Sequence, residues 1–155
     1  MARTLGVSAS ALQLDNQLCF ALYSATLAFT RMYTPLLSPL RLTYPQYLVM
    51  LALWETDRLT VTELGRRLTL DSGTLTPLLK RLAAHGYVRR QRSREDERRV
   101  LISLTPSGRA LKAKARAVVR ALGTTSICSE DEVVSLLQRL KSLRDEITRQ
   151  RLAAA

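Results

Sequence analysis

The sequence contains little cysteine and almost no histidine, the residues on which metal sites and disulfide frameworks depend. Its 155 residues include two cysteines, Cys19 and Cys128, and one histidine, His85, which we expect to be a polar surface residue. Two cysteines are too few for a disulfide-stapled scaffold or a four-ligand zinc site. We therefore expect a protein with no metal and no cofactor.

Long apolar runs are also missing. No run approaches the roughly 18 residues that a membrane span requires, and no signal peptide precedes the first helical pattern. Hydrophobic residues make up 46% of the chain and charged residues 24%, a balance typical of a globular protein. We expect residues 1–155 to form a single cytoplasmic domain with no membrane partner.

Acidic residues are scarce relative to basic ones. The chain has 13 Asp and Glu against 24 Lys and Arg, which gives a formal net charge of +11. This excess indicates a polyanionic partner, either a nucleic acid or an acidic membrane surface. Six arginines crowd into one short stretch, namely Arg89, Arg90, Arg92, Arg94, Arg98 and Arg99. Guanidinium groups suit forked contacts to phosphate and guanine, although such a charge run can also be a solvated loop.

Apolar periodicity and capping residues predict the order of the elements. The predicted helices cover residues 13–33, 43–55, 60–68, 71–86, 105–122 and 129–151. A strand at 87–92, a charged turn at 93–98 and a returning strand at 100–104 lie between the fourth and fifth helices. We expect Pro35 and Pro39 to end the first helix, and Pro77 to kink the fourth helix or loosen its first turn.

This order is typical of a winged helix-turn-helix within a helical frame, a mainly α fold with a small β-hairpin wing. We expect residues 45–105 to form the DNA-binding lobe. Residues 13–44 and 106–151 are the predicted dimerisation helices, because their apolar stripes exceed what a small lobe can bury. A twofold dimer places two recognition helices about 34 Å apart on successive major-groove faces. An intrachain helical bundle is the alternative.

The amino end of the fourth helix carries small polar side chains suited to DNA. Backbone amides and hydroxyls at a helix N-terminus can face bases and phosphates in the major groove. The predicted contacts on this helix are Ser72, Gly73, Thr74, Thr76, Pro77, Lys80 and Arg81. Helix capping alone would also explain the polar residues. The basic residues that follow, together with an arginine-rich hairpin able to reach the minor groove, favour double-stranded DNA as the partner.

Three segments resemble the MarR family of dimeric winged-helix repressors. They are Leu70–Leu82, Gly86–Val88 and Arg94–Gly108. The resemblance covers residues 13–150 and implies a homodimer on a palindromic operator. It also implies that Arg98 enters the minor groove and that Asp96 orients an arginine of the wing. We count Arg92 and Arg94 with them as wing contacts.

The amino-terminal third resembles one branch of that family, the organic hydroperoxide resistance regulators. The resemblance rests on Leu14–Ser24, Tyr33 and Leu42–Tyr47. It implies that an organic hydroperoxide oxidises Cys19 and that the hydroxyls of Tyr33 and Tyr44 hydrogen-bond to this cysteine. It also implies that Cys128 is the resolving thiol of the two-cysteine type.

Taken by themselves, these residues allow other interpretations. Cys19 could be a small buried hydrophobe, Cys128 inert, and the two tyrosines ordinary packing residues. Redox chemistry is favoured because Cys19 lies near the positive end of its predicted helix and Cys128 lies in a Gly/Thr/Ser break. Cys19 and Tyr33 are 14 positions apart, roughly 21 Å along a helix. A contact between them therefore has to come from the partner subunit.

We predict a repressor, not an enzyme, whose reduced homodimer binds DNA. Oxidation of Cys19 and an intersubunit disulfide to Cys128 then release the operator. Two alternatives stay open. A MarR-type repressor released by a noncovalent phenolic or lipophilic ligand would respond without either cysteine. A thiol peroxidase would consume peroxide continuously, but it gives the arginine-rich hairpin no role.

Overall fold

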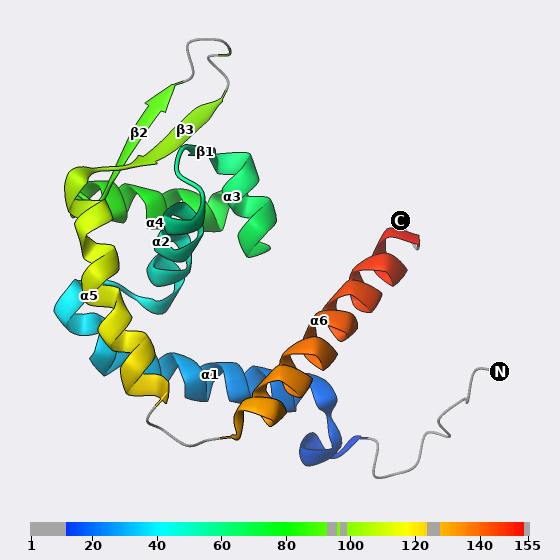
Figure 1. Ribbon diagram of the computed structural model, residues 1–155. Helices are drawn as coiled ribbons and strands as arrows, with labels where there is room; N and C mark the ends of the chain where they lie inside the picture. Colours follow the sequence, from blue (N-terminus) through cyan, green and yellow to red (C-terminus); the bar gives the residue numbers. More distant parts are fainter. Residues whose placement is uncertain (1–11, 93–95, 97–98, 124–127, 154–155) are drawn as a thin grey trace. The chain divides into compact units, whose positions relative to one another are not determined.

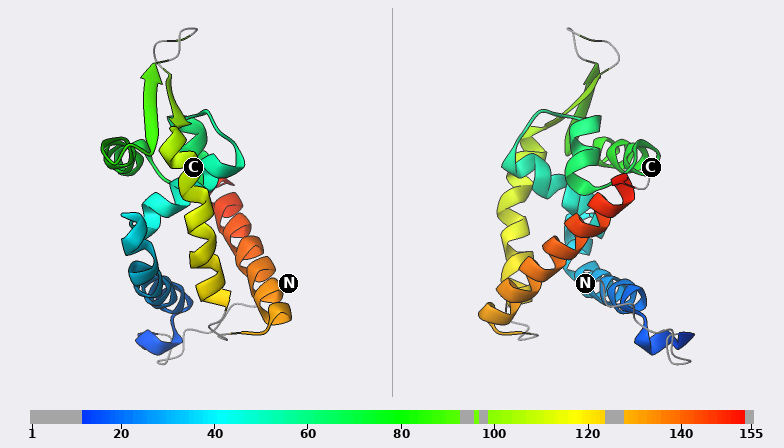
Figure 2. Two further views of the ribbon diagram at one scale, coloured as in Figure 1. Left: turned by 60° about the vertical axis from the view of Figure 1, so that its left-hand side comes forward. Right: turned by 90° about the vertical axis from the view of Figure 1, so that its right-hand side faces the viewer.

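The computed structural model describes residues 12–92, 96, 99–123 and 128–153. The chain divides into two compact units, residues 1–119 and 120–155, and each is described by itself. The first unit holds the helices α1 to α4 and a small sheet (Figure 1). Both views in Figure 2 show β2 and β3 extending together as a hairpin beyond the helices of this unit.

The first long helix, α1, covers Leu18–Leu37 and follows a 3-10 turn at Leu14–Asn16. The predicted start at residue 13 was therefore too early. Pro35 was expected to end this helix but lies inside it. A proline within a helix removes one backbone hydrogen bond and crowds the carbonyl four residues before it, but it does not by itself stop the helix. The helix ends two residues later, where Ser38–Leu40 forms a second 3-10 turn that contains Pro39.

Helix α2 covers Tyr44–Glu55 and forms the centre of the first unit. Its start is confirmed, because the Thr43 amide donates to the side chain of Gln46 at 2.9 Å. Most faces of α2 are buried, so it lacks a polar stripe. Among the described residues, the largest fully buried side chains come from α2 and the elements around it: Leu37, Val49, Met50, Leu53, Leu64, Leu75, Leu79, Leu82 and Ile102.

Helices α3 (Val61–Leu68) and α4 (Ser72–Ala84) form the predicted helix-turn-helix. The capping box is confirmed, since the Thr60 amide donates to Glu63 at 2.7 Å and the Glu63 amide to Thr60 at 3.2 Å. A side chain at Gly65 would put its Cβ 2.8 Å from the Leu70 carbonyl oxygen, so only glycine allows this close turn. Pro77 lies inside α4, and the helix continues through it to Ala84.

The predicted hairpin is confirmed as β2 (Val88–Arg92) and β3 (Val100–Leu104). The structure adds a short strand, β1 (Leu59–Thr60), which the sequence analysis did not predict. The three strands are antiparallel in the order β1-β3-β2. Two residues are too few to show the alternation by which strands are recognised in a sequence.

Helix α5 covers Pro106–Gly123 and begins in the first unit, where Leu111, Ala115 and Val118 are buried. The last helix, α6, covers Glu130–Ala153. Its capping box is confirmed, because the Ser129 amide donates to Glu132 at 2.8 Å. No residue of α6 is buried within the chain. Its predicted apolar stripe, which includes Val133, Leu136, Leu140 and Ile147, is exposed.

None of the described helices is long and apolar enough to cross a membrane. In the part of the chain that the structure describes, no group of three or more His, Cys, Asp or Glu side chains could hold a metal ion.

Candidate DNA interface and redox site

Asp71 caps the amino end of α4. Its carboxylate accepts hydrogen bonds from the Thr74 amide and the Thr74 hydroxyl, both at 2.8 Å. These two bonds hold the pKa of the Asp71 carboxyl below its usual range. Ser72 is therefore not the capping residue, and its exposed side chain is available at the helix start. The Thr74 hydroxyl, by contrast, is already engaged in the cap.

The predicted DNA contacts lie on the outer face of α4. Its inner face is fully buried through Leu75, Leu79 and Leu82. Six of the predicted contacts are exposed, namely Ser72, Gly73, Thr74, Pro77, Lys80 and Arg81, and Thr76 is half-buried at the edge of the face. The first amides of a helix lack partners within the helix and suit an anion. The exposed face of α4 therefore combines hydroxyls and two cations, while the Asp71 carboxylate already engages the Thr74 amide.

The wing exposes a row of basic side chains. In β2 only Val88 is buried, while Arg89, Arg90 and Arg92 are exposed. Asp96 is also exposed, and its carbonyl accepts a hydrogen bond from the Arg99 amide at 2.9 Å. Arg94 and Arg98, which were predicted to contact DNA, lie outside the described residues.

Cys19 is the second residue of α1 and is exposed in the chain. It shares this continuous helix with Tyr33, so the 14 positions between them correspond to roughly 21 Å along the axis. The structure therefore does not bring Cys19 and Tyr33 of one chain together. Cys128 is also exposed, immediately before the capping residue of α6 in the second unit.

The two predicted tyrosines do lie together. The ring centroids of Tyr33 and Tyr44 are 4.7 Å apart, and the buried Tyr47 ring lies 5.9 Å from that of Tyr33. Burial, followed by the neighbouring Tyr44 and Tyr47, raises the pKa of the Tyr33 phenol above its usual value. The Tyr33 hydroxyl therefore stays protonated and can donate a hydrogen bond at neutral pH.

A cavity of about 580 Å³ lies beside Tyr44, between the end of α1, the start of α2 and the end of α4. Tyr44 lines it together with three basic side chains, Arg41, Arg81 and His85. His85 was predicted at the surface but is half-buried. Its Nδ1 is buried and has no hydrogen-bond partner among the described residues. Sequence patterns gave no sign of this cavity, because its walls come from three separate elements.

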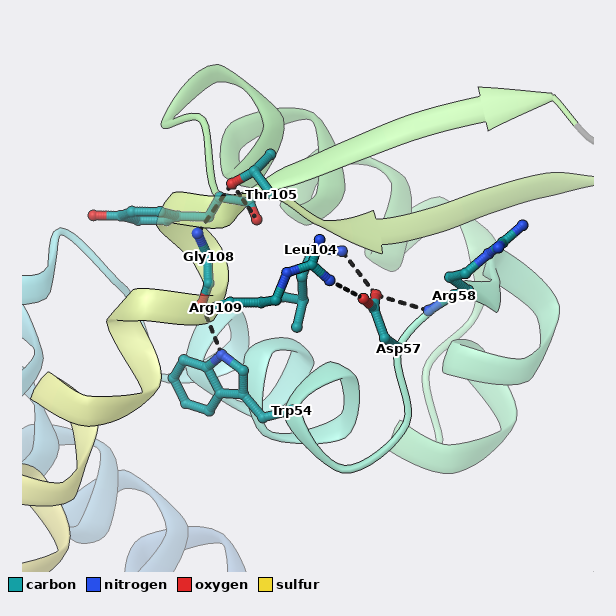
Figure 3. A network of polar contacts seen from close by, with 8 residues as sticks. Trp54, Asp57, Arg58, Leu104, Thr105, Gly108 and Arg109 are labelled. Carbon is teal, nitrogen blue, oxygen red and sulfur yellow. Dashed lines mark hydrogen bonds and ion pairs between the residues drawn. The ribbon is translucent and has the colours of Figure 1, made fainter.

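A polar network at the base of the wing was not predicted from the sequence (Figure 3). Asp57, in the turn after α2, accepts a hydrogen bond from the Leu104 amide at 2.8 Å and pairs with Arg109 at 2.5 Å. Trp54 Nε1 donates to the Gly108 carbonyl at 2.8 Å. These contacts connect α2 to the junction between β3 and α5.

A family model described as transcriptional regulator SarA/Rot matches residues 31–115. The organic hydroperoxide resistance transcriptional regulator of Bacillus subtilis (strain 168) is 51% identical over 132 residues, which are 84% of this chain and 86% of that protein. The chain belongs to the MarR and SarA/Rot family of winged-helix transcriptional regulators. A further relative of this MarR-family regulator is the HTH-type transcriptional regulator TtmR of Methylorubrum extorquens (strain PA1). It is 56% identical over 134 residues, 86% of this chain and 69% of that protein.

Solved structures share the fold of this MarR-family regulator. One is the structure of reduced AbfR bound to DNA; AbfR is a protein of Staphylococcus epidermidis. The match has a TM-score of 0.76 and 35% sequence identity, and it covers 90% of this chain and 98% of the AbfR chain. Disulfide-formed AbfR has a TM-score of 0.61 and 40% identity, over 86% and 94% of the two chains. Apo MarR from E. coli has a TM-score of 0.66 and 31% identity, over 82% and 96%. This chain is accordingly a DNA-binding transcriptional regulator, and it fits the organic hydroperoxide resistance regulators.

Proposed function

We propose that this regulator represses transcription in its reduced state and leaves DNA when an organic hydroperoxide oxidises Cys19. The observation that carries the proposal is the layout of α1, which has an exposed thiol in its first turn and the half-buried Tyr33 roughly 21 Å away. If the α1 helices of a dimer lie antiparallel, Cys19 of one subunit reaches Tyr33 and Tyr44 of the other. The 51% identity to the Bacillus subtilis organic hydroperoxide resistance regulator supports this assignment.

The chemistry needs only the thiol, the peroxide and proton donors. The Cys19 thiolate attacks the distal oxygen of the hydroperoxide, the O–O bond breaks, and the leaving alkoxide takes a proton to become an alcohol. Sulfur is oxidised to sulfenic acid and the peroxide is reduced. The protonated Tyr33 hydroxyl suits this step, because its hydrogen bond orients the thiolate.

Cys128 of the partner subunit is the proposed resolving thiol. It condenses with the sulfenic acid, so that an S–S bond forms and water leaves. A disulfide requires the two Cα atoms to lie within about 7 Å. Closing it therefore constrains α1 of one subunit against the segment before α6 of the other. Such a transient disulfide suits the cytoplasm, where thiols restore the reduced repressor.

DNA release follows from the geometry of a twofold dimer. We propose that the reduced homodimer reads a palindromic operator with the outer face of α4 in the major groove. The wing then reaches the minor groove through Arg92, Arg94 and Arg98, with Asp96 orienting one of these arginines. An intersubunit disulfide shifts one lobe against the other, so that the two α4 helices no longer match successive half-sites.

Non-reducing electrophoresis after treatment with cumene hydroperoxide tests the redox steps. We expect a dimer-sized band from the parent and none from Cys19→Ser or Cys128→Ser. The two variants differ in chemistry, because Cys128→Ser still forms a sulfenic acid that dimedone traps, whereas Cys19→Ser forms none.

Two results would contradict the redox proposal. If only a monomer band appears after hydroperoxide treatment, no intersubunit disulfide forms. Release of DNA by hydroperoxide from Cys19→Ser removes the sensing role of that thiol. Sustained peroxide consumption with added dithiol would instead indicate a peroxidase.

The cavity beside Tyr44 supports a second candidate function, release by a noncovalent phenolic or lipophilic ligand. His85 lines this cavity, its buried Nδ1 has no hydrogen-bond partner among the described residues, and Arg41 and Arg81 add positive charge. The test uses the double variant Cys19→Ser/Cys128→Ser with salicylate as the probe. Release of DNA from this variant, and its loss on adding His85→Leu, would support the second candidate; unchanged DNA binding would reject it for this probe.

A further inference from the structure

Side chains that lie far from the wing in the sequence form hydrogen bonds and an ion pair with its base. Asp57, in the turn after α2, binds the Leu104 amide and Arg109, and Trp54, in the last turn of α2, donates to the Gly108 carbonyl (Figure 3). All these residues belong to the first unit. The junction where the wing continues into α5 is thus attached to the α2 side of the lobe.

The Asp57 carboxylate replaces a backbone carbonyl as the hydrogen-bond acceptor at one position of the sheet. Strand β1 pairs with β3 so that Leu59 lies opposite Ile102 and Thr60 opposite Leu101. Continuing this register puts residue 57 opposite Leu104. The strand cannot continue, because Arg58 has a φ of 63°, in the left-handed region that strands do not use. The Asp57 carboxylate therefore accepts the Leu104 amide where a backbone carbonyl would have done so, and it also accepts the Arg58 amide at 2.8 Å.

We propose that Asp57 is a positioning residue for DNA binding, which sets the direction of the wing by holding the Leu104 amide. Leu104 lies opposite Val88, so this amide is at the root of the hairpin. From Leu104 to Val100, β3 extends roughly 13 Å. A rotation of about 10° at the root therefore moves the far end by about 2 Å, enough to break a hydrogen bond. The proposal rests on the contact of the wing arginines with DNA proposed above.

Of the three interactions of the Asp57 carboxylate, the ion pair with Arg109 and the hydrogen bond from the Leu104 amide contribute differently. In the ion pair the Arg109 side chain is 59% exposed and that of Asp57 is 29% exposed, and water screens such pairs strongly. The bond to the Leu104 amide is partly buried, and losing it leaves a backbone donor without its partner. Asp57→Asn can keep the hydrogen bonds from the Leu104 and Arg58 amides and lose only the ion pair, whereas Asp57→Ala loses all three interactions.

Whether Asp57→Ala weakens or strengthens DNA binding distinguishes a positioning role from a simple effect of charge. Removing a carboxylate makes the protein more positive, which by itself strengthens DNA binding. If Asp57 positions the wing, Asp57→Ala instead weakens binding. Asp131→Ala, at an exposed site in the first turn of α6, removes the same charge elsewhere and serves as the matched control.

The experiment uses the reduced full-length protein and a fluorescein-labelled duplex that the parent selects from a random library. Anisotropy gives the dissociation constant at fixed salt, and hydroxyl-radical footprinting maps the contacts. We expect Asp57→Ala to weaken binding roughly five- to tenfold and to lose protection at the outer minor-groove positions, while the central protection stays. Asp57→Asn should bind within about twofold of the parent. Thermal melting identifies any variant that fails to fold.

A combination with Arg92→Gln separates this proposal from the proposed wing contact. If Asp57 acts through the wing, adding Asp57→Ala to the Arg92→Gln variant lowers DNA affinity by a smaller factor than adding it to the parent. Unchanged binding by Asp57→Ala, a uniform loss of the footprint, full additivity, or the same weakening in Asp57→Asn would each overturn the positioning role. If Arg92→Gln binds like the parent and the parent protects no outer positions, the wing contact itself is wrong and the positioning role falls with it. If Asp57→Ala is too unstable to assay, Asp57→Ser, which also lacks the carboxylate, replaces it in the binding and footprinting comparisons.

Discussion

Tyr33 carries a hydroxyl whose proton is firmly held. Burial is the main cause, and the neighbouring Tyr44 and Tyr47 add to it, so the pKa of the phenol is raised above its usual value near 10. A raised pKa keeps the neutral, donating form through the whole physiological range. The group therefore suits donation to a thiolate and does not compete with it for a proton.

Replacing Tyr33 by phenylalanine tests this role at the scale of one atom. The ring keeps its packing against Tyr44, but the thiolate loses a donor. We expect Cys19 in the Tyr33→Phe dimer to be oxidised roughly ten- to a hundredfold more slowly. The measurement is the rate of dimedone-trapped sulfenic acid in the Cys128→Ser background.

Tyr87→Phe is the matched control for that experiment. Tyr87 donates its hydroxyl to the Leu40 carbonyl of its own chain at 3.0 Å, so this phenol has a structural partner and no proposed contact with Cys19. Its loss should lower the melting temperature and leave the oxidation rate unchanged. Equal slowing in both variants would remove the specific role of Tyr33.

How well single residues can be predicted depends on the sequence distance to their partners. The capping pair Thr60 and Glu63 is three positions apart, so the sequence displays it directly. Cys19 and the tyrosines were found through a resemblance carried by nearby residues. Asp57 and Leu104 are 47 positions apart, and nothing in either neighbourhood indicates the other. The positioning network was therefore invisible before the fold was known.

At the scale of elements, the start of α4 depends on one carboxylate. The Asp71 carboxyl has a lowered pKa because Thr74 donates two hydrogen bonds to it. A lowered folded-state pKa means that the stabilisation is complete above the unfolded pKa of about 3.9. It is then lost as the pH falls through the folded-state value.

Two substitutions separate the cap from its charge. We expect Asp71→Ala to lower the melting temperature by a few degrees at pH 7. Asp71→Asn keeps an acceptor for the Thr74 amide, so its melting temperature should stay close to that of the parent. Below about pH 4 the parent should lose stability more steeply than Asp71→Asn. Thermal melts by circular dichroism at pH 7, 4 and 3 provide the comparison, and parallel curves would contradict the assignment.

The elements that the sequence predicts well are those with strong local signals. The helix-turn-helix and the hairpin have caps, apolar periods and a change of period that fix their boundaries. Strand β1 has two residues and exists only because β3 lies beside it. The extent of α1 was misjudged because Pro35 strains the helix without stopping it, and α1 continues for two residues beyond the proline.

At the scale of the whole molecule, the chain by itself leaves apolar surface uncovered. No residue of α6 is buried, and α1 buries only Leu37. Contiguous apolar faces of this kind mark interaction surfaces. The sequence predicted these stripes from their spacing, and the family to which the chain belongs forms dimers. The spacing alone cannot say which residues of two copies meet, because it describes only one helix at a time.

The distance between Cys19 and Tyr33 on α1 has a genetic consequence. If each sensor takes its thiol from one chain and its phenol from the other, two defective alleles can complement one another. A mixed dimer of a Cys19→Ser chain and a Tyr33→Phe chain retains one complete sensor, whereas neither homodimer has any. Co-expression with two different affinity tags yields this mixed dimer, and its remaining thiol should react at the parent rate. Reaction at the slow rate of the Tyr33→Phe homodimer would instead place both groups' functions within a single chain.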